Sequence, residues 1–369
     1  MDEIDAVFEE LEDPRTGNAK RHALHEILVI ALCTVLCGGE TCADMALFGR
    51  SKRAFLEEFL TLAHGIPSHD TFSRVFRLLD ADRFHAWFIG FMKRFAEAYQ
   101  GVIAIDGKTL RRSFDRAAAR SPLHMVSAWA ADQRLVLAQI AVDDKSNEIV
   151  AIPKLLELLS LTGRILTADA IGCQRKIAEQ VIAQKGDYVL ALKGNQGSLH
   201  DDVRRFLDDP ETPLSTASDT DKGHGRIETR TASLSADIGW LQEHHAWPGL
   251  EAVGKVSATR EINGKITQET RYYLLSQVFT PARFNDIVRT HWSIENQLHW
   301  VLDVIMDEDQ VRNRKDHGPQ NLALLRRLAL NLAKLEPSKA SMRGKLKRAG
   351  WDNQFLRTML SQFANPQMR

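Results

Sequence analysis

The spacing of apolar residues changes once along this chain, close to residue 100, and this change restricts the folds that the chain can adopt. Up to residue 95, apolar side chains such as Phe72, Val75 and Phe76 recur every three or four positions, which is typical of helices with one buried face. From residue 101 onward, short apolar runs with strand-like composition alternate with helical segments. The sequence therefore predicts a helical unit followed by a mixed α/β unit.

The second unit contains five runs with the length and composition of strands, at 102–105, 124–130, 135–142, 165–168 and 188–192. Helical segments fit between the later runs, at 152–161 and 175–185. Strands with short connections pair as an antiparallel meander, whereas strands connected through a helix pair in parallel. The order therefore predicts a mixed β-sheet flanked by helices, as in ribonuclease H-like folds.

Residues 200–271 interrupt this pattern, because they begin with a polar, strand-poor stretch and continue with short alternating strands at 226–231, 254–259 and 265–270. A strand at 272–276 and a long helix after Pro281 then resume the α/β pattern. We expect four parts: an N-terminal helical domain at 1–95, a ribonuclease H-like core at 96–199 and 272–335, a β-rich insertion at 200–271, and a basic helical tail at 336–369.

Within the helical domain, residues 55–79 have the pattern helix, short turn, helix, with a break at Gly65-Ile66-Pro67 and Ser68 or Asp70 as the N-cap of the second helix. This pattern is compatible with a helix-turn-helix that contacts DNA ends. It is equally the pattern of a generic pair of packed helices. The sequence leaves both interpretations open.

The 48 basic and 48 acidic residues cancel, so net charge does not predict a nucleic-acid-binding protein. The distribution is uneven, because residues 1–13 hold seven acids without Lys or Arg, whereas 338–349 hold five basic residues without an acid. Such asymmetry permits a local phosphate-binding surface, although solvated helix faces produce the same pattern.

The four cysteines, Cys33, Cys37, Cys42 and Cys173, form no paired Cys-x-x-Cys pattern, so they indicate core packing and not a zinc site. The most apolar stretch, 27–37, has about half the length needed to cross a bilayer and lacks the features of a signal peptide. We therefore expect a cytoplasmic protein with reduced thiols and no membrane partner.

Three acids stand at positions that favour an active site. Asp106 and Asp169 each end a predicted buried strand, and Glu295 lies on the predicted helix that follows Pro281. A carboxylate at the end of a buried strand is costly unless it is solvated, hydrogen-bonded or bound to a cation. The three acids together predict a divalent-metal site for phosphoryl chemistry, although capping or salt-bridging is the competing interpretation for each of them.

Magnesium prefers oxygen ligands, and two ions ~3.5–4 Å apart can activate an attacking oxygen and stabilise a leaving oxygen. Asp106 bridging both ions, with Asp169 and Glu295 each completing one site, satisfies that geometry. A zinc site on His291, Glu295 and His299 is disfavoured, because the two histidines lie eight residues apart. The nearby acidic run is typical of a solvated face, and it consists of Asp303, Asp307, Glu308 and Asp309.

Cationic and polar residues close to these acids and strands are candidates for DNA contacts. They are Lys108, Arg111 and Arg112 after Asp106; Lys193, Asn195 and Gln196 after the strand at 188–192; His224, Arg226 and Arg230 along one strand face; His291 on the Glu295 helix; and Lys345, Lys347 and Arg348 in the tail. The water-facing side of a hairpin is the alternative interpretation for the strand face.

Four motifs, in order and spread over nearly the whole chain, resemble those of the ISAs1-type insertion-sequence transposases, which include the H-repeat-associated proteins. They are Ala104-Ile105-Asp106-Gly107-Lys108, Thr167-Ala168-Asp169-Ala170-x-Gly172-Cys173-Gln174, His224-Gly225-Arg226-x-Glu228-x-Arg230, and His291-Trp292-x-Ile294-Glu295-Asn296-x-Leu298-His299-Trp300-x-Leu302-Asp303-Val304. The resemblance implies a DDE transposase with a ribonuclease H-like core and an N-terminal associated helical domain. It also implies Asp106, Asp169 and Glu295 as catalytic acids and dependence on Mg²⁺, for which Mn²⁺ is the expected substitute.

The wider IS4-like group carries Tyr-x2-Arg-x3-Glu-x6-Lys around its last acid, and this chain has Val288, His291 and Leu302 at the Tyr, Arg and Lys positions. The resemblance therefore supports the acids and not that group's helper residues. We expect cleavage at insertion-sequence ends followed by attack of the 3′-hydroxyl on target DNA, carried out by a homodimer on double-stranded DNA. The alternatives are a ribonuclease H-like nuclease without strand transfer and a catalytically silent DNA-binding relic.

Overall fold

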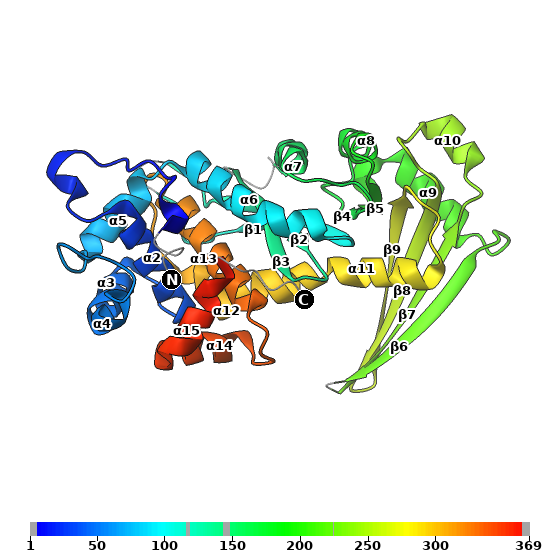
Figure 1. The fold of residues 1–369 in the computed structure, drawn as a ribbon. Coiled ribbons are helices and arrows are strands. Elements are labelled where there is room, and N and C mark those ends of the chain that lie inside the picture. The colour runs from blue at the N-terminus through cyan, green and yellow to red at the C-terminus, as the bar shows by residue number, and fades with distance from the viewer. Residues whose placement is uncertain (1–5, 116–118, 143–147, 224, 364–369) are drawn as a thin grey trace.

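The structure is a computed structural model that describes residues 6–115, 119–142, 148–223 and 225–363. It is elongated, with a helical body at one end, the predicted α/β core in the middle, and long strands at the other end (Figure 1). The first helices are α2 (Leu24–Leu36), α3 (Cys42–Ser51), α4 (Arg53–Leu56), α5 (His69–Leu78) and α6 (Ala81–Ala98), preceded by the 3-10 turns η1 (Ala6–Phe8) and η2 (Gly17–Lys20). The prediction of a helical N-terminal part is confirmed.

Nine strands form one mixed sheet in the order β3-β2-β1-β4-β5-β9-β8-β7-β6. The five predicted runs are the strands β1 (Val102–Thr109), β2 (His124–Ala130), β3 (Leu135–Val142), β4 (Ile165–Ala168) and β5 (Asp187–Leu192). The first three pair antiparallel, and β4 pairs in parallel with both β1 and β5. The mixed sheet and its predicted pairing are therefore confirmed, in the arrangement expected of a ribonuclease H-like core.

The β-rich segment extends this sheet. Its strands are β6 (Ser215–Gly223), β7 (Arg226–Ser235), β8 (Ala252–Ile262) and β9 (Lys265–Leu275). The sequence predicted two strands at 265–270 and 272–276, but they are one strand, whose end pairs antiparallel with β5 through Val189 and Leu275. The expected boundary at residue 272 therefore falls inside β9. Between the strands lie α9 (Ser198–Asp208) and α10 (Gly239–His245), which the sequence did not predict.

Helices cover both faces of the core sheet. One face is covered by α7 (Glu148–Glu157) and α8 (Arg175–Ala183), and α11 (Pro281–His291) crosses the other from β6 and β7 to β4 and β1 (Figure 1). Phe284 of α11 lies against Gly254 of β8, where a Cβ atom would overlap the aromatic ring. Further along, Arg289 of α11 pairs with Asp219 of β6 at 2.6 Å. Because α11 spans both parts of the sheet, it fixes the β-rich segment relative to the core.

The two ends of the chain form the helical body together. The central helix α13 (Gly318–Leu335) packs against α2, α5, α6 and β3, while α14 (Met342–Trp351) and α15 (Asn353–Leu360) pack on α13 and α2. On α13, the side-chain amide of Asn321 donates to the carbonyls of Phe76 and Leu79 at 2.9 and 2.8 Å. The predicted basic tail is therefore part of a packed helical unit.

The expected pattern of helix, short turn, helix at 55–79, for which a helix-turn-helix and a generic pair of packed helices were both open, is not found. The first helix, α4, has only four residues, and the segment 57–68 separates it from α5. The hydroxyl of Ser68 caps α5 by accepting from the amide of Thr71 at 3.3 Å. Gly65, in the left-handed region at φ +72°, and the following proline prevent a short turn between two helices. In the described part of the chain, no helix combines the length and apolar character needed to cross a bilayer.

Candidate active site

Strand pairing brings the first two acids to one edge of the sheet. Ile105 of β1 is paired in parallel with Ala168 of β4. Asp106 therefore stands beside Asp169, the first residue after β4, although Asp106 lies inside β1 and does not end it as the sequence predicted. Neighbouring strands lie ~4.8 Å apart, and the carboxyl ends of parallel strands open at the same edge. The residues that form the buried strands therefore also determine where the two acids emerge.

A short loop after β4 holds Asp169. Its Oδ1 accepts hydrogen bonds from the amides of Ile171 at 2.9 Å and Gly172 at 3.3 Å. The connection between β5 and α9 fixes the same loop, since Asn195 donates to the carbonyl of Ala170 at 2.7 Å. Its neighbour Gln196 donates to the carbonyl of Cys173 at 2.6 Å. These two polar residues, predicted to contact DNA, support the Asp169 loop in the structure.

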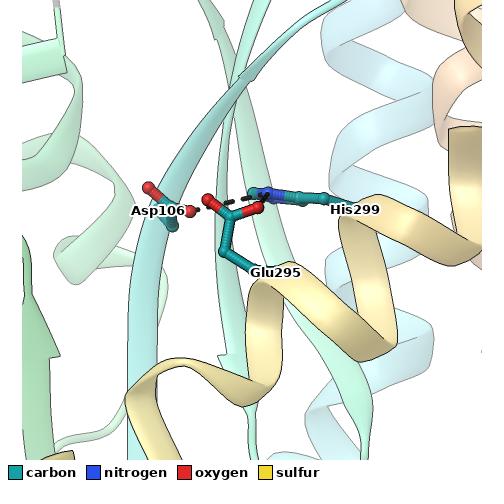
Figure 2. Close-up of side chains that lie close together, drawn as sticks. All are labelled: Asp106, Glu295 and His299. Atoms are coloured by element: carbon teal, nitrogen blue, oxygen red, sulfur yellow. Dashed lines mark hydrogen bonds and ion pairs between the residues drawn. The ribbon is translucent and has the colours of Figure 1, made fainter. Parts of the chain in front are cut away.

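Glu295 lies on the helical segment that follows α11. After α11, the chain continues through the π-helical turn η5 (Glu295–His299) into α12 (Trp300–Val304). The indole Nε1 of Trp129 on β2 donates to the hydroxyl of Ser293 at 3.3 Å, which ties the start of this turn to the sheet. Glu295 and His299 both point toward Asp106 on β1 (Figure 2). The fold thus brings Glu295, which the sequence placed on a helix, close to Asp106.

An imidazole joins the two carboxylates. The Nδ1 atom of His299 lies 3.5 Å from Oδ2 of Asp106 and 3.4 Å from Oε2 of Glu295. Ligand-type atoms of these three residues all lie within 4.8 Å of one another, which makes them a group that could hold a metal ion. Asp169 lies outside this group of three among the described residues. From the sequence, His299 was weighed only as a zinc ligand, although its position four residues after Glu295 already indicates that the two side chains share one helix face.

The electrostatics of the group fit a cation. Burial and the nearby carboxylates of Glu295, Asp169 and Glu148 raise the pKa of Asp106 to about 8. The hydrogen bond with His299 lowers the pKa of Glu295. Several carboxylates are thus crowded at one partly buried point, where a divalent cation would relieve their repulsion. The donor set, rich in carboxylate oxygens, suits Mg²⁺ or Mn²⁺.

A cavity of about 220 Å³ lies beside Asp169, and its lining includes Lys193, His291 and Trp292. His291 Nδ1 and the hydroxyl of Thr167 are 3.0 Å apart, and burial lowers the pKa of this histidine to about 4. The guanidinium of Arg271 lies 4.3 Å from the centre of the Trp292 ring. A neutral imidazole, an exposed lysine and an aromatic ring therefore surround the space next to the second acid.

Two of the predicted DNA-contacting lysines have protein partners instead. Lys108 is 7% exposed, and its ammonium group lies among three carboxylates. Lys345 is 5% exposed and forms an ion pair with Glu336 at 3.0 Å. Because both ammonium groups are buried and paired, the expectation that they are free to contact DNA phosphates is corrected.

The other predicted DNA-contacting residues lie at or near the surface. Arg111 is 81% exposed on its side chain, and Arg226 and Arg230 pair with the buried Glu228 at 3.6 and 2.8 Å. In the tail, Lys347 is exposed, and the guanidinium of Arg348 lies 4.2 Å from the centre of the Phe355 ring. The backbone carbonyl of Arg112 accepts a hydrogen bond from Arg314 at 3.0 Å. His224 lies outside the described residues.

The acidic run after α12 is also different from the prediction of a solvated face. Glu308 is 2% exposed, and its carboxylate pairs with Arg327 of α13 at 2.7 Å. Asp303 and Asp309 are only partly exposed and both face Lys108. Glu308 can be buried because Arg327 of α13 and Lys108 of β1 both lie beside it, and these two cations are far from it in the sequence.

Comparisons with known proteins agree with this architecture. Residues 6–92 match the family described as DDE_Tnp_1-associated, and residues 99–332 match the family described as Transposase DDE domain. The "H repeat-associated putative transposase YhhI" of Escherichia coli K12 is 36% identical over 92% of this chain and 93% of its own length. The "Uncharacterized protein in dhlA 3'region" of Xanthobacter autotrophicus is 46% identical over 74% of this chain and 94% of its own length.

Among solved structures, a cryo-EM structure of piggyBac transposase in a synaptic complex with hairpin DNA aligns with 99% of this chain and 78% of its own. The TM-score is 0.47 and the sequence identity 12%, a likeness too slight to add to the family assignment. The sequence matches cover both the helical part and the part of the chain that contains Asp106, Asp169 and Glu295. The chain belongs to the DDE transposases, with a DDE catalytic domain preceded by its associated helical domain.

Proposed function

We propose that this transposase cuts DNA at the ends of its insertion sequence and joins the freed 3′-hydroxyl to target DNA, with Asp106, Asp169 and Glu295 as the catalytic acids. The observation that carries the proposal is the meeting of Asp106 and Glu295 at the sheet edge where Asp169 also emerges. Both reactions are in-line displacements at phosphorus, so one site can serve both.

The acids would hold Mg²⁺, with Mn²⁺ as a substitute and two ions in the complete site. When bound, such ions supply activation of the attacking oxygen and stabilisation of the leaving oxygen. Magnesium prefers oxygen ligands, so His299 would act as a hydrogen-bond partner that orients the carboxylates of Asp106 and Glu295 through Nδ1. Asp169, whose Oδ1 is fixed by two amides, would offer Oδ2 as a metal ligand.

Double-stranded DNA is the proposed substrate, both at the terminal repeats and at the target. The exposed cations Arg111, Lys193, Arg226 and Lys347 are the candidates for phosphate contacts in this structure. Phosphate contacts supply affinity and register, while sequence must be recognised through the bases. We further propose that the protein acts as a homodimer in the cytoplasm, with one subunit for each end of the element.

The test is Asp106→Asn, which keeps the size of the side chain and removes its charge. We expect loss of Mg²⁺-dependent cleavage of a terminal-repeat duplex, with binding of the same duplex retained in a gel-shift assay. Asp201→Asn is the matched control, because Asp201 is an exposed acid on α9 whose side chain, in the described part of the chain, forms ion pairs with Arg204 and His200. Full cleavage by the Asp106 variant would show that the acid assignment is wrong.

A second substrate separates strand transfer from simple cleavage. A duplex with an exposed 3′-hydroxyl should be joined to plasmid DNA by the parent protein in Mg²⁺. Nicked product without joined product would instead favour a ribonuclease H-like nuclease. Salt-dependent binding without any product would favour a DNA-binding relic.

A further inference from the structure

Lys108 lies two residues after Asp106 on β1. Side chains two positions apart on a strand point to the same face, so Lys108 and Asp106 face the same layer of helix. The ammonium group of Lys108 lies 2.6 Å from Oδ1 of Asp303, 3.0 Å from Oδ1 of Asp309 and 3.3 Å from Oε2 of Glu308. These three carboxylates compensate for the burial of the ammonium charge.

Strand and helix meet in two parallel pairs of side chains. In the first pair, Asp106 lies beside His299, and in the second, Lys108 lies beside Asp303. Two residues of a strand advance by roughly 6.6 Å, and four residues of an α-helix advance by about 6 Å. The two spacings match, so β1 runs alongside the helical segment from His299, the last residue of η5, to Asp303 in α12.

The second pair is anchored to the helical body. Glu308, which also contacts Lys108, forms an ion pair with Arg327 on α13, and neither of these two side chains has any exposed surface. Asp309 is held by Lys108 and by Arg111. A chain of charged contacts therefore runs from β1, through the segment after α12, to the central helix of the body.

We propose that Lys108 is a positioning residue for the metal site, which holds α12 against β1 so that Glu295 and His299 stay within ligand distance of Asp106. The inference rests on the proposed function, because it takes this acid group as the metal site. Without the ammonium group, Asp303, Glu308 and Asp309 would face one another across the same buried point. Their repulsion would move α12 away from β1 and open the group of ligands.

The experiment measures Mn²⁺ binding to the purified full-length protein, by the electron paramagnetic resonance signal of the free ion and without DNA. We expect Lys108→Met to weaken Mn²⁺ binding by about tenfold or more, as for loss of a residue that supports metal ligands. Lys108→Arg should retain more of the affinity than Lys108→Met, because it keeps the positive charge.

The matched control is Lys345→Met. Lys345 is equally buried and is paired with Glu336, so its loss should cost comparable folding stability, but it lies in α14, away from the acids. We expect this variant to bind Mn²⁺ like the parent protein. Equal weakening in both variants would mean that general destabilisation is the cause and would overturn the proposal.

Two further variants separate a failure of the positioning role from a failure to fold and from a wrong metal site. If Lys108→Met does not fold, Asp303→Asn removes the shortest contact and leaves Glu308 and Asp309 on the lysine, and we expect an intermediate loss of Mn²⁺ affinity. Parent-like binding by Lys108→Met, or by this substitute, would overturn the positioning role. Parent-like binding by Asp106→Asn would instead mean that the metal site itself is misassigned, which concerns the proposed function.

Discussion

Gly107 is the residue with the least room for change next to the proposed active site. An added Cβ atom would overlap the side chains of His124 and Glu148, which form a buried pair at 2.5 Å. We expect Gly107→Ala to lower the free energy of unfolding by about 1–3 kcal/mol and to weaken Mn²⁺ binding, because the strand must shift at Asp106. Urea unfolding and Mn²⁺ titration measure the two effects.

The control for this glycine is Gly90→Ala, in the exposed middle of α6, where nothing lies within 4 Å of an added Cβ atom. Alanine is favoured over glycine inside a helix by roughly 0.5–1 kcal/mol, so this variant should be slightly more stable than the parent. If Gly107→Ala were as stable and bound Mn²⁺ as well as Gly90→Ala, the close packing behind Asp106 would be irrelevant to the site.

The buried pair of Glu308 and Arg327 predicts a dependence of stability on pH. Burial alone would raise the pKa of Glu308, but Arg327 and Lys108 lower it to about 2. A depressed pKa contributes stability above the unfolded value of about 4.3, and that contribution is lost as the pH falls toward the folded value. Arg327→Met should therefore destabilise the protein by about 3–5 kcal/mol at neutral pH.

The difference between this variant and the parent should shrink as the pH falls below about 4, where Glu308 can take up a proton. Urea midpoints measured across pH test this. Arg53→Met is the control, because the pair of Arg53 and Glu57 at 2.7 Å is exposed and should contribute at most about 1 kcal/mol. A constant difference at all pH values would mean that the charge of Glu308 is not the cause.

At the scale of elements, the connection between β5 and α9 supports the end of β4. Asn195→Ala removes the amide that holds the carbonyl of Ala170, so the loop of Asp169 loses one of its supports. We expect slower Mg²⁺-dependent cleavage together with a stability loss of about 1 kcal/mol. The control is Gln180→Ala, because Gln180 of α8 also donates a side-chain hydrogen bond to a backbone carbonyl, that of Pro153 in α7, at 2.9 Å.

The Gln180 variant should lose similar stability and keep its cleavage rate. Equal rates in the two variants would show that the support of the Asp169 loop does not matter for catalysis. Rates of single-turnover cleavage and midpoints of urea unfolding are the two measurements.

The sequence predicts an element well when the burial of that element leaves a clear apolar pattern in its residues. The run at 124–130 is buried at every position, and its predicted bounds are those of β2. By contrast, β6 is almost wholly exposed and built from small polar residues, so it has no apolar alternation to detect. The π-helical turn at Glu295–His299 has no sequence signature either, yet it determines how His299 meets Asp106.

The candidate site was predictable in part for the same reason. Buried apolar runs precede both Asp106, inside β1, and Asp169, directly after β4, and the motifs around Glu295 resemble those of a known family. The partner of Lys108 was not predictable, because 195 or more residues separate it from Asp303 and its neighbours along the chain. The sequence alone does not distinguish a lysine that contacts phosphate from one that contacts a buried carboxylate.

At the scale of the whole molecule, α13 joins the helical body to the edge of the sheet. Asn331 of α13 accepts from the amide of Val136 on β3 and donates to its carbonyl, both at 2.9 Å. Asn331→Leu would leave both buried backbone groups without these bonds, and we expect a loss of about 2–4 kcal/mol in the free energy of unfolding. Urea unfolding followed by circular dichroism and by tryptophan fluorescence measures the loss in both parts.

For comparison, Asn353→Leu changes an exposed residue whose contact is with Lys52 at 2.7 Å, and it should be close to neutral. If the two variants were equally stable, the hydrogen bonds between Asn331 of α13 and Val136 of β3 would not contribute to stability. A loss seen by one optical probe only would mean that the helical body and the sheet unfold separately.

The contacts of β1 with the helical segment 299–303 depend on the number of residues in that segment, which matters when transposase genes are compared. One residue gained or lost within 295–303 turns the following side chains by about 100° around the helix axis. A change before His299 would turn both His299 and Asp303 away from β1, and a change after it would turn Asp303 alone, even though Asp106, Asp169 and Glu295 are all still encoded. A copy can therefore be inactive with every acid intact, and the length of this interval is a separate criterion for recognising functional genes.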